Sequence, residues 1–179
     1  MASQKTKTAS VLVLLMFCIS AVAHAQDAAP VAAPGTAAAA PQNAWVINCS
    51  TGAGGTELDC QMSQLLTDTK TGQRVLTVTI RKDAAQGGMA MLVALPHGLY
   101  LPAGATYQID AGKAVPVAIQ TSDQNGSYAA APMDATLIGA LKAGTTLNIG
   151  MESVSRQPVV IPVSLAGFTA VIDKLETLK

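Results

Sequence analysis

Short apolar segments that alternate with period two are the feature that most limits how this chain can fold. Between residues 76 and 80 every second residue is Leu, Val or Ile, and threonine fills the positions between them. Such alternation is typical of a strand with one buried face. Comparable segments recur along the chain with turn residues between them: 45–49, 60–66, 89–95, 105–110, 115–119, 147–151 and 159–165. Together these segments predict about eight strands.

The connections between these segments are too short for the helical crossovers that parallel strands require. We therefore expect a mainly β protein, an antiparallel β-sandwich or flattened barrel. Ala111–Gly112 is expected to join two strands, and Asn125–Gly126 to form another tight turn. The nearly continuous apolar run 89–95 predicts a central strand that is buried on both faces. Pro158 and Pro162 place the last strand at an edge or a bulge.

Two segments break the alternation and predict short helices. The first follows Asp134, whose carboxylate can cap a helix, and it ends before Gly144 with Lys142 in its last turn. Its apolar face would carry Leu137, Ile138 and Leu141. The second helix is expected to start at Ser164. Its apolar positions at helical spacing are Phe168, Ile172 and Leu175.

The first 25 residues have the three parts of a secretory signal peptide. Two lysines give a positive start, residues 11–22 form an apolar run, and Ala23-His24-Ala25 offers small residues for cleavage. We expect the cut between Ala25 and Gln26. The alternative is an uncleaved membrane anchor, but the apolar run is shorter than the roughly 20 residues of a transmembrane helix. No later segment is apolar for long enough to span a bilayer.

Residues 26–43 are almost entirely alanine, proline, glycine and small polar residues. Such a segment cannot bury enough apolar surface to offset the entropy of ordering it, so it predicts a flexible linker. The length of the remainder suits one domain. The expected organisation is therefore a signal peptide at 1–25, a linker at 26–43 and a single β-rich domain at 44–179.

Removal of the signal peptide would take Cys18 with it and leave one pair, Cys49 and Cys60. In an oxidising compartment such a pair predicts a disulfide, here one that joins the first two strands into a hairpin. The loop that it closes is about twelve residues long and is worth about 3 kcal/mol in the chain-entropy account. A redox-active pair is the alternative, but such pairs usually have the spacing Cys-x-x-Cys, which this pair lacks.

Few side chains in the mature sequence could carry chemistry. His97 is its one histidine, so a histidine-based metal site is excluded, and no glycine motif for phosphate or dinucleotide binding is present. We therefore expect no metal and no cofactor. Basic residues are scattered, whereas a nucleic-acid partner would need them clustered. We expect a protein without catalytic activity. The alternative is a hydrolase that uses His97, although no Gly-x-Ser-x-Gly motif supplies a nucleophile.

An ordered set of short motifs runs through the domain. Two of them are fairly specific: Leu95-Pro-His-Gly-Leu-Tyr-Leu101 and Val163-Ser-Leu-Ala-Gly-Phe168. The others are Trp45 with Cys49, Cys60-Gln-Met with Gln64, Gly72-Gln-Arg-Val-Leu76 and Gln108-Ile-Asp110. The ordered set resembles the invasion-associated locus B family over roughly residues 44–175.

The resemblance implies a small exported protein of a Gram-negative bacterium, periplasmic or associated with the outer membrane. Some members of the family take part in host-cell invasion, and the family has no established catalytic residues. Members often carry a second cysteine pair after the strand that matches 115–120, whereas residues 121–127 of this chain contain no cysteine. We expect the Asn125–Gly126 turn to hold that corner instead.

Export, a disulfide and a β-rich domain together favour a non-enzymatic envelope protein that acts through protein contacts. The expected partner is a protein of the bacterial envelope or of a host cell. The contact between them is expected to serve host interaction or the response to envelope stress. The expected location is the periplasm, with the outer membrane or the medium as alternatives. The alternative function is to carry a small ligand in a pocket between the sheets, and hydrolysis through His97 is less favoured.

Overall fold

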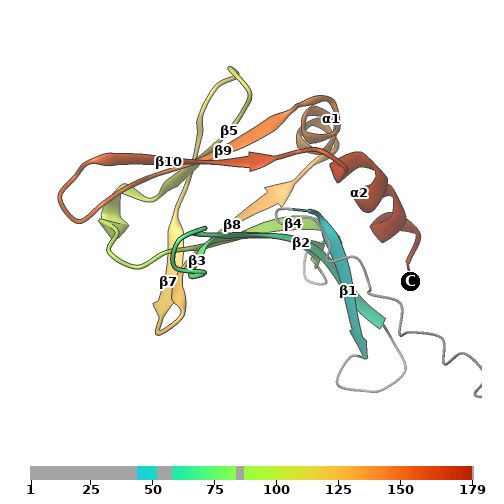
Figure 1. Ribbon diagram of the computed structural model, residues 1–179. Coiled ribbons are helices and arrows are strands. Elements are labelled where there is room, and N and C mark those ends of the chain that lie inside the picture. The colour runs from blue at the N-terminus through green and yellow to red at the C-terminus, as the bar shows by residue number, and fades with distance from the viewer. Residues whose placement is uncertain (1–43, 52–57, 84–86, 179) are drawn as a thin grey trace, which may run out of the picture. The chain divides into compact units, whose positions relative to one another are not determined.

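Two antiparallel β-sheets face each other across the hydrophobic core of this computed structural model (Figure 1). The structure describes residues 44–51, 58–83 and 87–178. The predicted signal peptide 1–25, its cleavage site between Ala25 and Gln26 and the predicted linker 26–43 lie outside the described residues.

The larger sheet has six strands in the order β1-β2-β3-β4-β8-β7, and the smaller sheet has four in the order β10-β9-β5-β6. A short 3-10 helix, η1 (Leu101–Ala103), precedes β5. The bounds of the strands are Val46–Thr51 (β1), Leu58–Thr67 (β2), Arg74–Asp83 (β3), Gly88–Leu95 (β4), Ala105–Ile109 (β5), Val115–Val117 (β6), Ile119–Asp123 (β7), Gly126–Met133 (β8), Thr146–Glu152 (β9) and Pro158–Ser164 (β10).

This architecture confirms the predicted antiparallel sandwich, and the sheets do not close into a barrel within the described residues. Ten strands are present where the pattern predicted about eight. The predicted strand 115–119 is two strands, because the chain crosses from the smaller sheet to the larger one at Ala118. Strand β8 was not predicted because it is rich in alanine, which has low β propensity and gives no clear alternation.

Two local predictions from the strand pattern are wrong. The connection between β5 and β6 spans residues 110–114 rather than Ala111–Gly112 alone, because Asp110 takes a left-handed conformation with φ 48° at the end of β5. Strand β4 lies inside the larger sheet, but its buried residues, Met91, Val93 and Leu95, all lie on one face. Ala90, Leu92 and Ala94 on the other face are half-buried. In a two-layer sandwich the second sheet covers one face only.

Strand β10 lies at an edge of the smaller sheet, as its prolines predicted. Just before this strand, Ser153 N donates to Gln157 O, so these two residues form a hydrogen-bonded pair. Because such pairs alternate with non-hydrogen-bonded pairs along an antiparallel ladder, the backbone bonds to β9 lie at the odd-numbered residues of β10. Pro158 and Pro162 therefore lie at positions whose backbone groups point away from β9. The open edge thus lacks N–H donors that an added strand would need.

The first predicted helix is confirmed as α1 (Ala135–Ala143), and Asp134 Oδ1 accepts a hydrogen bond from Leu137 N at 2.7 Å. The second helix, α2 (Phe168–Thr177), begins later than predicted. Ser164 does not start it but ends β10, and the chain turns into the helix at Gly167, which has φ 80°. No helix among the described residues is both long enough and apolar enough to cross a membrane.

Helix α2 packs against β1 and β2 and contributes Phe168, Ile172 and Leu175 to the core, all fully buried. The Trp45 ring meets the Phe168 ring edge to face at a centroid distance of 5.2 Å. Trp45 Nε1 also donates to Ser164 O at 2.9 Å. The beginning of the domain is therefore fixed to its last strand and its last helix.

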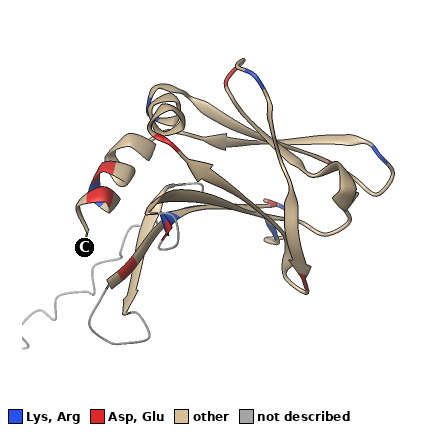
Figure 2. Ribbon diagram, turned by 180° about the vertical axis from the view of Figure 1, so that it is seen from behind, with Lys and Arg blue, Asp and Glu red and all other residues tan. Residues whose placement is uncertain are grey.

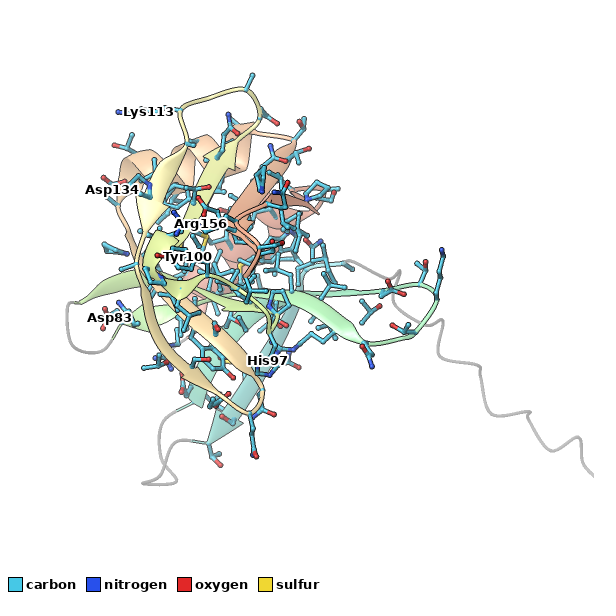
Figure 3. The ribbon with its side chains drawn as sticks, turned by 90° about the vertical axis from the view of Figure 1, so that its left-hand side faces the viewer. Asp83, His97, Tyr100, Lys113, Asp134 and Arg156 are labelled. Atoms are coloured by element: carbon cyan, nitrogen blue, oxygen red, sulfur yellow. A yellow bond between two sulfur atoms is a disulfide. The ribbon has the colours of Figure 1, made fainter. Side chains whose placement is uncertain are left out.

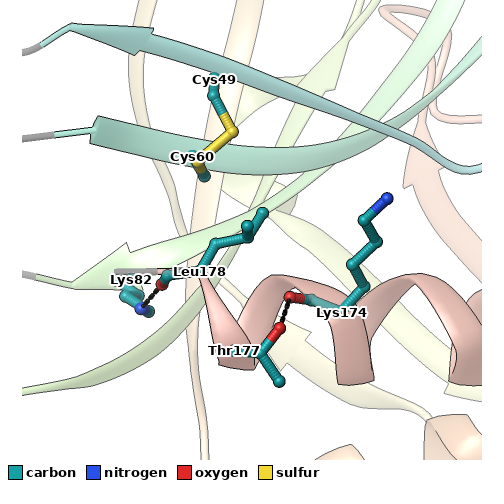
Figure 4. Close-up of a disulfide and its surroundings, with 6 residues drawn as sticks. All are labelled: Cys49, Cys60, Lys82, Lys174, Thr177 and Leu178. Carbon is teal, nitrogen blue, oxygen red and sulfur yellow. Dashed lines mark hydrogen bonds between the residues drawn. A yellow bond between two sulfur atoms is a disulfide. The ribbon is translucent and has the colours of Figure 1, made fainter.

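The predicted disulfide between Cys49 and Cys60 is present (Figure 4). The two residues lie directly opposite each other in the β1–β2 pair, so the bond joins the two strands of a hairpin, as predicted. Cys60 is buried, whereas Cys49 is exposed on the outermost strand. The disulfide therefore ties an edge strand to the strand that carries part of the core.

Candidate functional site

His97 lies in the connection between β4 and η1 and is exposed. Figure 3 labels His97, and its Nε2 atom is 3.1 Å from the backbone oxygen of Gln124, which lies in the turn between β7 and β8. Within the part of the chain that the structure describes, neither a carboxylate nor a hydroxyl group forms a hydrogen bond with this imidazole. The structure therefore does not bring His97 together with the other members of a hydrolytic triad.

The corner beside His97 is held by hydrogen bonds from several directions. Asp123 Oδ1 accepts from Asn125 N at 2.7 Å and from the Tyr128 hydroxyl at 3.1 Å, and the Arg74 guanidinium donates to Asn125 O. The hydrogen bond from Asn125 N lowers the pKa of Asp123. The turn residues are Gln124 and Asn125 rather than the predicted Asn125–Gly126, because Gly126 already pairs with Asp123 as the first residue of β8.

Two shallow hollows adjoin each other around η1. The first, about 210 Å³, lies between η1 and the edge of the smaller sheet, and the second, about 410 Å³, lies between η1 and the β6–β7 crossing. We call their lining residues the apolar rim: 101–106, 116–119, 150–152 and 158–160. Glu152 is the one charged residue in this set. Helix η1 and strand β10 contain no charged residue, so neither carries the red or blue of charged residues in Figure 2.

A third hollow is a groove between helix α1 and the β5–β6 hairpin, with a volume of about 440 Å³. Apolar atoms of Tyr107, Ile109 and Leu137 line its wall. Lys113 and Asp134 carry the charged groups of the groove, on the hairpin and at the start of the helix (Figure 3). The volume falls in the range of about 300–1,000 Å³ that is typical of small-molecule sites.

Asp110 fixes the two walls of this groove relative to each other. Its Oδ1 accepts hydrogen bonds from Thr145 Oγ1 at 2.6 Å and from Thr146 N at 2.9 Å, just after helix α1 ends. The hydrogen bond from the Thr145 side chain, followed by those from the Thr145 and Thr146 amides, lowers the pKa of Asp110. The ionised carboxylate therefore ties the β5–β6 hairpin to the segment between α1 and β9.

Asp110→Asn is expected to reduce the loss of stability in acid. Because the folded state lowers the pKa of Asp110, its contribution is present above the unfolded-state pKa and is lost as the pH falls through the folded-state value. Denaturant unfolding measured between about pH 5 and pH 2 should show a shallower acid limb for the variant than for the wild type. Thr145→Val, which removes the hydroxyl donor, should have a smaller effect in the same direction. Superimposable acid limbs for the wild type and Asp110→Asn would contradict the assignment.

A metal site needs several ligands in one place, and the described residues contain no group of three or more His, Cys, Asp or Glu side chains that could hold a metal ion.

Comparison with known proteins identifies the family to which the chain belongs. The family model for the invasion associated locus B (IalB) protein matches residues 45–176. The chain belongs to the IalB family.

Two curated relatives of this IalB protein have similar names and similar coverage. Invasion protein B homologues of Brucella abortus, from strain 2308 and from biovar 1 strain 9-941, are each 34% identical over 135 residues, which span 75% of this chain and 76% of the relative. The crystal structure of invasion associated protein b from Bartonella henselae has a TM-score of 0.66 at 24% identity and covers 74% of this chain and 90% of that one. This likeness confirms the fold. The relatives and the disulfide also indicate an exported protein.

Sequence reasoning on this IalB chain singled out His97 and missed the apolar rim and the α1 groove. One signal could have indicated the first hollow. Gly150 lies inside β9 between Thr106 and Val160, and a Cβ added there would meet Thr106 Oγ1. A glycine inside a strand often marks such a close approach. The groove has no comparable signal, because its walls are far apart in the sequence.

Proposed function

We propose that this IalB protein is a non-enzymatic protein of the bacterial envelope that acts through protein contacts, and that the apolar rim is its contact surface. The observation that carries the proposal is the exposure of large apolar side chains on this rim: 41% for Leu101, 38% for Val159 and 61% for Val160. Exposed apolar surface that is contiguous and bordered by polar residues is typical of protein interaction sites.

Membership of the IalB family supports a location in the bacterial envelope for such contacts. An exported protein with a disulfide belongs in an oxidising compartment, and we place it in the periplasm or at the outer membrane. The relatives are named for invasion, which favours a partner in host interaction; a partner in the envelope itself, including one engaged under envelope stress, fits the same surface.

The experiment is a cross-linking capture from envelope extracts with two matched variants. Val160→Lys places a charge within the rim, whereas Val154→Lys makes the same change at an exposed residue, 69% accessible, outside both hollows. The wild type and Val154→Lys should capture the same partner, and Val160→Lys should recover about tenfold less of it or none. Equal recovery by the two variants, or a wild type without a reproducible partner, would contradict the proposal.

A second candidate function is the binding of a small amphipathic ligand in the α1 groove. Between the sheets, the cavity lined by Met91, Val93 and Ile149 holds only about 10 Å³, which is too small for a ligand. The groove instead offers an apolar wall with Lys113 and Asp134 for polar ends of a ligand. A thermal-shift screen of small amphipathic acids and amines tests this function, since a ligand stabilises the state that it binds. Hits should lose their effect in Ala140→Gln, which fills the groove, and keep it in Ala143→Gln on the same helix.

A further inference from the structure

Strand β1 differs from the other three strands at the edges of the two sheets. Strand β10 has prolines at the positions that point outward, β6 has only three residues and includes Pro116, and β7 has a register shift between Ile119 and Thr121. Each of these features discourages pairing with a further strand. Strand β1 has six residues without proline, charge or a register shift.

The disulfide shows which backbone groups of β1 point toward the open edge. Cys49 and Cys60 are directly opposite each other with a Cα–Cα distance of 4.0 Å, which identifies a non-hydrogen-bonded pair. Because pair types alternate along an antiparallel ladder, the N–H and C=O groups of Ile47, Cys49 and Thr51 point away from β2. Among the described residues, no hydrogen bond reaches these groups.

We propose that β1 pairs with β1 of a second copy of this chain, in an antiparallel arrangement about a two-fold axis at Cys49. This register places Ile47 opposite Thr51 of the partner subunit and Cys49 opposite Cys49 of the partner subunit. Each pair exchanges two backbone hydrogen bonds, so all outward groups of the three residues are satisfied. The larger sheet then continues from one subunit into the other.

The side chains of β1 favour a second copy as the occupant. The two-fold register makes Asn48 face Ser50 of the partner subunit on the outer side of the sheet, a pair that can hydrogen-bond. On the inner side, the β-branched residues Ile47 and Thr51 meet across the axis, and such pairs stabilise a sheet. No charged residue lies between Val46 and Thr51, so two identical edges do not repel each other. The edge is therefore complementary to itself.

The experiment compares two double variants that differ in the sign of one charge. In Asn48→Lys/Ser50→Lys, two lysines face each other twice across the axis; in Asn48→Glu/Ser50→Lys, opposite charges do. Both variants place Lys at position 50 opposite Asp59 within the subunit, so the intrachain surroundings of that lysine match. Sedimentation velocity over a concentration series, with the disulfide intact, should give a dimer for the wild type and for the second variant. The first variant should show a dissociation constant about tenfold higher than that of the second.

Two further measurements test the register and guard against misfolding. Thr51→Pro removes an outward donor without removing a ladder bond to β2, and should also raise the dissociation constant of the dimer while leaving the circular dichroism spectrum unchanged. In the wild type, hydrogen exchange at Ile47, Cys49 and Thr51 should slow as the protein concentration rises. A wild type that stays monomeric over the series would overturn the proposal, as would equal dissociation constants for Asn48→Lys/Ser50→Lys and Asn48→Glu/Ser50→Lys. Loss of the dimer in Val160→Lys alone would assign it to the apolar rim and overturn pairing through β1.

Discussion

Phe168→Ala is expected to lower the free energy of unfolding by about 3–5 kcal/mol. The Phe168 side chain is fully buried at the start of α2 and supports Trp45 by an edge-to-face contact at 5.2 Å. Its removal leaves a cavity and also loosens the indole that donates to the backbone of β10. The substitution therefore weakens the junction between the first strand, the last strand and the last helix.

Urea unfolding followed by tryptophan fluorescence measures this effect directly, since Trp45 is the one tryptophan. Phe168→Leu keeps an apolar side chain and should cost less, about 1–2 kcal/mol, which preserves a readout if the alanine variant fails to fold. Lys174→Ala on the exposed side of the same helix is the control and should remain within about 0.5 kcal/mol of the wild type. A cost below about 1 kcal/mol for Phe168→Ala would show that this junction does not stabilise the fold.

Cys49→Ala/Cys60→Ala is expected to destabilise the domain by about 3 kcal/mol. In the chain-entropy account the bond restricts the unfolded chain, and the eleven-residue separation of the cysteines sets the size of the term. The loss also affects the folded state locally, because β1 is an edge strand and, among the described strands of the subunit, pairs with β2 alone. The melting temperature should fall by roughly 10 °C for a domain of this size.

The wild type in a reducing agent is the matched comparison for this variant. Reduced wild type and Cys49→Ala/Cys60→Ala without reducing agent should melt at similar temperatures, and the reducing agent should leave the variant unchanged. Calorimetry with and without the reducing agent provides the measurement. A reduced wild type that melts at the same temperature as the oxidised protein would contradict a stabilising role for the bond.

Local patterns determined most of the secondary structure of this IalB protein. Period-two alternation located β3 and β9, and the capping carboxylate of Asp134 located α1, since each of these signals depends on neighbouring residues alone. The two cysteines predicted the hairpin for a similar reason, because a disulfide between them fixes the pairing of the strands around them. Strand β8 escaped detection because its alanines are held in a strand by pairing with β4 and β7, not by their own preference.

The sequence by itself therefore determined the class of fold, the disulfide and the family. Only the tertiary structure decided which edges are open, where the hollows lie and that His97 contacts a turn rather than a catalytic partner. The physical reason is distance along the chain. The apolar rim joins residues 101–106 to 158–160, and the α1 groove joins the β5–β6 hairpin to a helix that follows two further strands. Such contacts depend on how the sheets pack, and no local periodicity encodes them.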